Sequence, residues 1–293
     1  MPWRTNILSE LRDEYARELY PLYGKEEADS LLRLLIERYF GKSRADLVVE
    51  PEYRISESEM LRLHFAVKEL KAFRPIQYIL KSVEFMNTRL LVDESVLIPR
   101  PETEEMAAWI ADREKGNKGL KVMDLGTGSG CIAIALAKHL PESEVHGIDI
   151  SEKALTVAGK NQFANEVMVQ FHHADMLDPD SYAYLDLFDV VVSNPPYVTF
   201  SEKKFMRENV LRYEPASALF VRDEEPLLFY RAILYFSKEK LRDGGRIYLE
   251  INERYGKEVA ALAGRFGFGE VTIRQDLSGK DRFVSGIKQT LPQ

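Results

Sequence analysis

The sequence contains a single cysteine, Cys131, among its 293 residues. One cysteine can form neither an internal disulfide nor a zinc site built from several cysteines. The five histidines lack the spacing of metal ligands, and no apolar run approaches the roughly 18 residues that span a bilayer. Residues 1–6 also lack the apolar core of a signal peptide. We therefore expect a cytoplasmic protein with no metal and no membrane association.

An excess of positive charge is also missing. The chain has 40 Lys and Arg against 47 Asp and Glu, a net charge of −7, and residues 1–75 alone have 13 against 14. Proteins that bind nucleic acid usually carry a basic surface that displaces counterions from phosphates. The composition therefore argues against a direct nucleic-acid partner, although a local basic patch could still form on folding.

The chain divides into three regions by pattern. Residues 1–75 have apolar side chains at three- and four-residue spacing, which predicts a small helical bundle that ends at Pro75. Residues 76–98 hold short β-prone pieces around Asn87-Thr88, which predicts a hairpin linker between two domains. The third region, residues 99–293, opens with an amphipathic helix from Pro101, for which Thr103 is the expected N-cap.

Strands and helices alternate after residue 118. This rhythm predicts an α/β fold with a doubly wound, mostly parallel, seven-stranded sheet whose last two strands form an antiparallel hairpin at one edge. The expected strands are 120–125, 144–150, 168–171, 188–193, 246–251, 270–275 and 282–287, and the expected helices are 132–139, 151–162, 225–236 and 255–266.

A glycine-rich loop joins the first strand of this region to its first helix. Glycines let the backbone turn tightly and approach a ligand closely. The third glycine of a dinucleotide fingerprint is replaced by Cys131, and the Lys-Ser/Thr of a P-loop is missing. An acid directly before the glycines would repel a pyrophosphate but attract the ammonium and sulfonium of S-adenosylmethionine. The expected cofactor contacts in this loop are Asp124, Gly126, Thr127, Gly128, Ser129 and Gly130.

Acidic residues also end the next two strands. Asp149 lies 23 residues beyond Gly126, where a carboxylate can accept hydrogen bonds from both ribose hydroxyls. Asp175 could accept a hydrogen bond from an adenine amino group while Met176 packs on the ring. Taken alone, each acid is more often a helix cap or a turn residue, but the occurrence of Asp124, Asp149 and Asp175 at three successive strand ends favours a cofactor site.

The most informative motif is Asn194-Pro195-Pro196-Tyr197, which follows the apolar strand 188–193. Two successive prolines cannot continue the hydrogen-bond ladder of the sheet, so they stiffen a turn at the carboxyl end of the strand. Asn194 Oδ1 and the Pro195 carbonyl could accept the two hydrogens of a planar –NH2 group, and the Tyr197 ring could cover one face of that group.

These motifs resemble, in order, those of the class I S-adenosylmethionine-dependent methyltransferases. Asn-Pro-Pro-Tyr is similar to the signature shared by enzymes that methylate adenine N6, cytosine N4 and glutamine N5. Residues 74–79, 96–104 and 248–251 further resemble the release-factor glutamine methyltransferases. That resemblance implies methylation of the glutamine in the Gly-Gly-Gln loop of class 1 translation release factors. The helical region could be a partner-recognition module or a lid, and its position in the chain favours recognition of the release factor.

Two departures from the family pattern concern geometry. Lys81 and Asn87 stand where glycines are common, which implies a modified hairpin.

The main alternative function is N6-adenine methylation of RNA or DNA, and a second is a silent scaffold that only binds S-adenosylmethionine. The related ribosomal-protein glutamine methyltransferases share Asn-Pro-Pro-Tyr but usually differ around residues 99–104, so the release-factor branch fits better.

Overall fold

The computed structural model describes residues 5–290. Parts of the expected outer domains (1–75 and 99–293), and most of the segment considered for a signal peptide, lie outside the described residues. The chain forms two compact units: one runs up to Lys81 and includes Glu208–Tyr213, and the other comprises Ser82–Arg207 and the residues from Glu214 onward. The expected linker 76–98 is thus divided between the two units.

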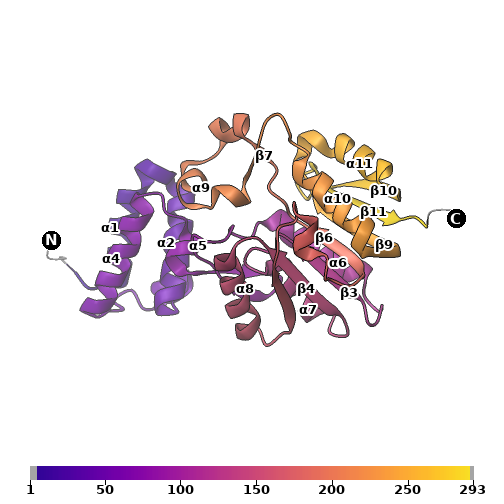
Figure 1. The fold of residues 1–293 in the computed structure, drawn as a ribbon. Helices are drawn as coiled ribbons and strands as arrows, with labels where there is room; N and C mark the ends of the chain where they lie inside the picture. Colours follow the sequence, from indigo (N-terminus) through magenta and orange to yellow (C-terminus); the bar gives the residue numbers. More distant parts are fainter. Residues whose placement is uncertain (1–4, 291–293) are drawn as a thin grey trace. The chain divides into compact units, whose positions relative to one another are not determined.

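The first unit is helical, as the apolar spacing predicts. Its longer helices each bury one apolar face, and Ser43 and Ser56 form capping boxes at the start of α3 (Arg44–Val49) and α4 (Glu57–Lys71) that satisfy backbone N–H groups there. The Tyr213 hydroxyl donates to the Ala72 carbonyl at 2.8 Å and ties the inserted segment to this unit. The helices are α1 (Leu8–Tyr23), α2 (Lys25–Phe40), α3 (Arg44–Val49), α4 (Glu57–Lys71), α5 (Ile76–Leu80) and α9 (Glu208–Tyr213) (Figure 1).

Pro75 does not end the helical region, which corrects the prediction. Proline has no N–H to lose at a helix start, and here it is the N-cap of α5, whose Tyr78 and Ile79 N–H groups donate to the Pro75 carbonyl. The β-prone residues 78–80 are therefore helical. Lys81 ends α5 in the left-handed conformation (φ 55°), which explains why glycine suits this position.

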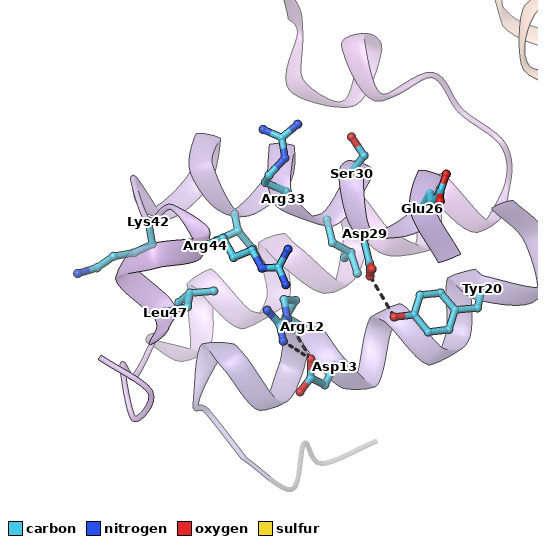
Figure 2. A pocket seen from close by; sticks show the side chains of 12 residues that line it. Arg12, Asp13, Tyr20, Glu26, Asp29, Ser30, Arg33, Lys42, Arg44 and Leu47 are labelled. Atoms are coloured by element: carbon cyan, nitrogen blue, oxygen red, sulfur yellow. Dashed lines mark hydrogen bonds and ion pairs between the residues drawn. The ribbon is translucent and has the colours of Figure 1, made fainter. Parts of the chain in front are cut away.

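A cavity of about 340 Å³ lies among α1, α2 and α3 of the helical unit. Figure 2 shows Arg12, Arg33 and Arg44 toward one end of it and Tyr20 with Asp29 toward the other. The Tyr20 hydroxyl donates to Asp29 Oδ1 at 3.0 Å. Charged and polar side chains make up most of its lining, beside the apolar Leu32, Ile36 and Leu47.

The second unit begins with the predicted hairpin. Strand β1 (Ser82–Phe85) pairs antiparallel with β2 (Thr88–Leu91). Met86 and Asn87 both have positive φ (46° and 55°), the conformation of a two-residue turn whose twist matches the strands. Asn87 thus takes a position that glycine or asparagine tolerates well.

The main sheet has seven strands in the order β10-β11-β9-β6-β3-β4-β5. Strands β5, β4, β3, β6 and β9 are parallel, and β11 and β10 close one edge antiparallel, as predicted. The strands are β3 (Lys121–Leu125), β4 (Glu144–Asp149), β5 (Val169–His173), β6 (Phe188–Ser193), β9 (Leu241–Glu250), β10 (Phe268–Gln275) and β11 (Asp281–Lys288).

Helices cover both faces of this sheet. Alternate residues of the buried strands face opposite ways, so Met123 and Leu125 pack with α10 and α11, whereas Val122 packs with α6 and α7. These helices are α6 (Pro101–Arg113), α7 (Cys131–His139), α8 (Glu152–Ala164), α10 (Leu228–Lys240) and α11 (Gly256–Arg265) (Figure 1). The fold is that of a class I methyltransferase.

The segment between β6 and α10 was not predicted in detail. It contains the short parallel strands β7 (Val198–Thr199) and β8 (Phe220–Val221). Two-residue strands have no periodicity that a sequence pattern could reveal. Short 3-10 helices lie in this segment at Phe200–Phe205 and Ala216–Ala218, and elsewhere at Pro179–Tyr182 and Glu253–Tyr255.

Candidate active site

Four parallel strands bring the predicted site residues to one edge of the sheet. Leu125, at the end of β3, lies opposite Ile148 of β4 on one side and Ser193 of β6 on the other. The Ser193 hydroxyl donates to the Leu125 carbonyl at 2.7 Å. The glycine loop after Leu125 and the Asn-Pro-Pro-Tyr corner after Ser193 therefore begin side by side, at the edge where α/β sheets bind ligands.

The glycine loop has the backbone that its sequence predicts. Gly126, Gly128 and Gly130 all have positive φ (73°, 55° and 80°), which is strained for other residues. A Cβ on Gly130 would lie 3.0–3.2 Å from three side chains, so packing of α7 also requires glycine there. The N–H groups of Gly126 and Thr127 both donate to the Ile148 carbonyl at 2.9 Å and fix the start of the loop.

Asp124 is completely buried below this loop. Thr127 donates to its Oδ2 at 2.7 Å, whereas no residue within 5–290 is hydrogen-bonded to its Oδ1. Burial raises the pKa of Asp124 to about 7, because the charged form has lost its solvation. A buried carboxylate with an unused acceptor suits a cationic ligand, so this residue fits the methionine end of S-adenosylmethionine.

The other predicted acids also lie at this edge. Gly128 N–H donates to Asp149 Oδ2 at 2.9 Å, so the carboxylate joins the ends of β3 and β4, and burial raises its pKa. Asp175 Oδ1 accepts from the Leu177 N–H at 2.8 Å, which leaves its other oxygen for a ligand. The Met176 methyl lies against Gly126, 3.1 Å from where a Cβ would stand. The register thus brings the predicted cofactor residues together.

The Asn-Pro-Pro-Tyr corner is half-buried and held from below. Asn194 Nδ2 donates to Thr103 Oγ1 at 2.9 Å. The Tyr197 hydroxyl donates to Glu250 Oε1 at 2.9 Å, and burial raises the pKa of Tyr197 well above its ordinary value. The phenol end of Tyr197 is therefore fixed inside the protein, so only its ring is left to contact a substrate.

Thr103 and Glu250, which hold the Asn-Pro-Pro-Tyr corner in place, were not predicted as site residues. Thr103 is not the N-cap of α6, because Arg100 takes that position and Pro101 begins the helix. The Thr103 hydroxyl instead donates to Glu250 Oε2 at 2.7 Å. Glu250 ends β9, next to β6 in the sheet, and burial raises its pKa to about 7. The strand order is needed to predict this contact, because Ser193, next to Asn194, lies opposite Leu249, next to Glu250.

Arg100 and Glu214 form a second support near the site. Arg100 Nη2 donates to Glu214 Oε1 at 2.6 Å, and the Ile98 N–H donates to Oε2 of the same buried carboxylate. This pair fixes the turn after Ile98 to the segment that follows the corner. Cys131 is packed at the start of α7, and burial raises the pKa of its thiol to about 12, so it stays protonated.

Sequence relatives identify the family. The chain is 40% identical to the release factor glutamine methyltransferase of Flavobacterium psychrophilum, over 95% of this chain and 98% of that protein. It is 39% identical to the release factor glutamine methyltransferase of Bacteroides thetaiotaomicron, over 92% and 97% of the two chains. The chain belongs to the release factor glutamine methyltransferase family.

Both parts of this family member match domain families. Residues 116–248 match a methyltransferase domain, and residues 10–80 match the PrmC N-terminal domain. Among solved structures, a methyltransferase from Pyrococcus furiosus covers 80% of this chain and all of its own, with 14% identity and a TM-score of 0.51, which supports the fold. The cofactor is S-adenosylmethionine, and the N6-adenine alternative is not favoured.

Two further expectations concern absences. Within residues 5–290, no cluster of three or more His, Cys, Asp or Glu side chains could hold a metal ion. In the same part of the chain, no helix combines the length and apolar character needed to cross a membrane.

Proposed function

We propose that this chain transfers a methyl group from S-adenosylmethionine to the side-chain N5 of the glutamine in the Gly-Gly-Gln motif of class 1 release factors. The orientation of Asn194 carries the proposal. Because its Nδ2 donates to Thr103, its Oδ1 is left to accept a hydrogen from a substrate amide. The corner also starts beside the glycine loop, which supports an acceptor close to a methyl donor held by that loop.

The reaction needs a positioned nitrogen rather than a strong base. An amide nitrogen is a poor nucleophile because its lone pair is delocalised into the carbonyl. We propose that Asn194 Oδ1 and the Pro195 carbonyl accept both N–H hydrogens and direct the lone pair toward the methyl group, while Pro196 stiffens the turn and Tyr197 packs on the amide. Proximity and fixed dipoles then supply most of the rate.

Each cofactor residue is assigned to a cofactor group of matching charge and hydrogen-bonding character. S-adenosylmethionine supplies an electrophilic methyl group on a cationic sulfur. We propose that Asp124 accepts from its ammonium group, that Asp149 accepts from the ribose hydroxyls, and that Asp175 and Met176 contact the adenine. The backbone of Gly126, Thr127, Gly128, Ser129 and Gly130 forms the rest of the cradle. The positive φ of the loop and the unused Asp124 acceptor support this assignment.

We propose that the helical unit, residues 1–75 in the sequence division, recognises the release factor, with the hairpin as linker and residues 99–293 as the catalytic domain. The match of residues 10–80 to the PrmC N-terminal domain and the polar cavity among α1, α2 and α3 support a recognition role. We further propose that the protein acts in the cytoplasm, where release factors are made, and without direct contact to nucleic acid.

A methylation assay with two release-factor substrates tests the function. The protein is incubated with S-adenosylmethionine and a purified class 1 release factor, or with a variant whose Gly-Gly-Gln glutamine is replaced by asparagine. We expect one added methylene on the glutamine of the first substrate, located by peptide mass spectrometry, and none on the second. Methylation of another residue, or of RNA in a control reaction, would refute the proposal.

A further inference from the structure

We propose that Thr103 and Glu250 are positioning residues that dictate which end of the Asn194 carboxamide faces the substrate. The inference rests on the proposed function, because it assigns a role to groups beneath the same corner. Neither side chain needs to touch the substrate, since both act through Asn194.

The direction of each hydrogen bond carries the argument. Above its raised pKa of about 7, Glu250 is an ionised carboxylate that only accepts, so the Thr103 hydroxyl then donates its single hydrogen to Glu250 Oε2 at 2.7 Å. The lone pairs of Thr103 Oγ1 then remain for a donor, which is Asn194 Nδ2 at 2.9 Å. A flipped carboxamide would place its oxygen against those lone pairs with no hydrogen between them. The Asn194 oxygen is therefore kept outward, toward the substrate amide.

The same carboxylate holds the other end of the corner. Glu250 Oε1 accepts from the Tyr197 hydroxyl at 2.9 Å. Glu250 thus fixes both Asn194, through Thr103, and Tyr197 directly. The two ends of the tetrapeptide cannot move independently while the carboxylate stays in place.

The burial of Glu250 without a direct ion pair argues that this arrangement is more than packing, although the charge of Arg282 lowers its pKa somewhat. Its side chain is completely buried, yet no ion pair among residues 5–290 includes it. The nearby Arg282 guanidinium is bound instead to Asp276 at 3.1 Å. A buried carboxyl without an ion pair costs stability, and such groups gather at functional sites. Here the residue holds the corner that carries the reaction.

Steady-state kinetics of Thr103 variants test the inference. Thr103→Val keeps the shape of the side chain but removes the hydroxyl, so Asn194 Nδ2 loses the oxygen that accepts its hydrogen bond. We expect kcat to fall on the order of tenfold to hundredfold, with the Kd for S-adenosylmethionine and the KM for the release factor within about threefold of wild type. Thr103→Ser keeps the hydroxyl and should recover most of the loss.

Two controls separate positioning from folding. Thr88 is as buried as Thr103 but lies in the hairpin, so Thr88→Val should leave kcat within about twofold of wild type. In an Asn194→Ala background, Thr103→Val should have no further effect on kcat, because the carboxamide through which Thr103 acts is already missing. Glu250→Gln, with a neutral group in place of the obligate acceptor, should also lower kcat.

The results distinguish a failure of this inference from a failure of the proposed function. A Thr103→Val enzyme with wild-type kcat, or additive losses in the double variant, would overturn the inference while leaving the proposed function intact. If the wild-type enzyme itself fails to methylate the release factor, the proposed function is wrong. If Thr103→Val does not fold, Glu250→Gln with near wild-type kcat would still refute the role.

Discussion

Asn161 of α8 donates one Nδ2 hydrogen to the Ser129 carbonyl in the glycine loop, at 2.9 Å. The same carboxamide is paired in both directions with the backbone of Leu91 in the hairpin, at 2.6 and 2.9 Å. One fully buried side chain therefore joins the hairpin to the cofactor loop.

Replacing Asn161 by alanine should destabilise the protein. The change removes the partner of the buried Ser129 carbonyl and of the part-buried Leu91 N–H and carbonyl, and a buried group left unpaired costs about 1–3 kcal/mol. Allowing for relaxation, we expect the free energy of unfolding in urea to fall by about 3 kcal/mol. Asn165→Ala is the matched control, because that half-buried amide also donates to the hairpin, at Arg89, yet should cost less than about 1 kcal/mol. Equal losses would contradict the role of Asn161.

The sequence predicted the sheet, its helices and the cofactor loop because their apolar periods and glycines are local signals. It was wrong at Pro75 and Thr103, where proline began a helix and a threonine expected to cap one instead binds a distant acid. The pairing of Thr103 with Glu250 joins residues 147 positions apart, about half of the chain, and depends on strand order. Local patterns do not contain that information, so the support under Asn194 was found only in the structure.

Replacement of Asp149 should weaken cofactor binding selectively. Asp149→Asn keeps one acceptor oxygen but loses the charge, and its amide nitrogen replaces an oxygen that accepts from the Gly128 or the Ser151 N–H. We expect the Kd for S-adenosylmethionine, measured by calorimetry, to rise on the order of tenfold to hundredfold, about 1–3 kcal/mol. Glu152→Gln, an exposed charge change three residues later in the chain, should leave the Kd near wild type. A normal Kd in Asp149→Asn would remove this residue from the site.

The buried Asp124 should make stability depend on pH. Burial raises its pKa to about 7 from 3.8, so the folded state binds more protons than the unfolded state in that window. The free energy of unfolding therefore falls as pH rises through the window. Asp124→Asn does not titrate, and relative to wild type it should gain about 2 kcal/mol between pH 5 and pH 8 in urea unfolding without cofactor. A pH-independent difference would contradict the raised pKa.

The glycines of the cofactor loop should differ in their tolerance of alanine. A Cβ at Gly128 meets nothing within 4 Å, so Gly128→Ala adds only the strain of a positive φ, about 1–2 kcal/mol. At Gly130 the new methyl would also press on Ile134, Ala158 and Phe171. We expect Gly130→Ala to lose at least about 1 kcal/mol more than Gly128→Ala in thermal or urea unfolding. The reverse order would contradict the packing of α7 against the loop.

Single-turnover methyl transfer by Asn194→Ala tests the central claim most directly. Enzyme saturated with S-adenosylmethionine is mixed with the release factor, and the methylated glutamine peptide is quantified by mass spectrometry over time. If Asn194 positions the amide, the rate constant should fall on the order of a hundredfold or more, while the Kd for S-adenosylmethionine stays within about threefold of wild type. A rate constant near that of the wild type would contradict the account.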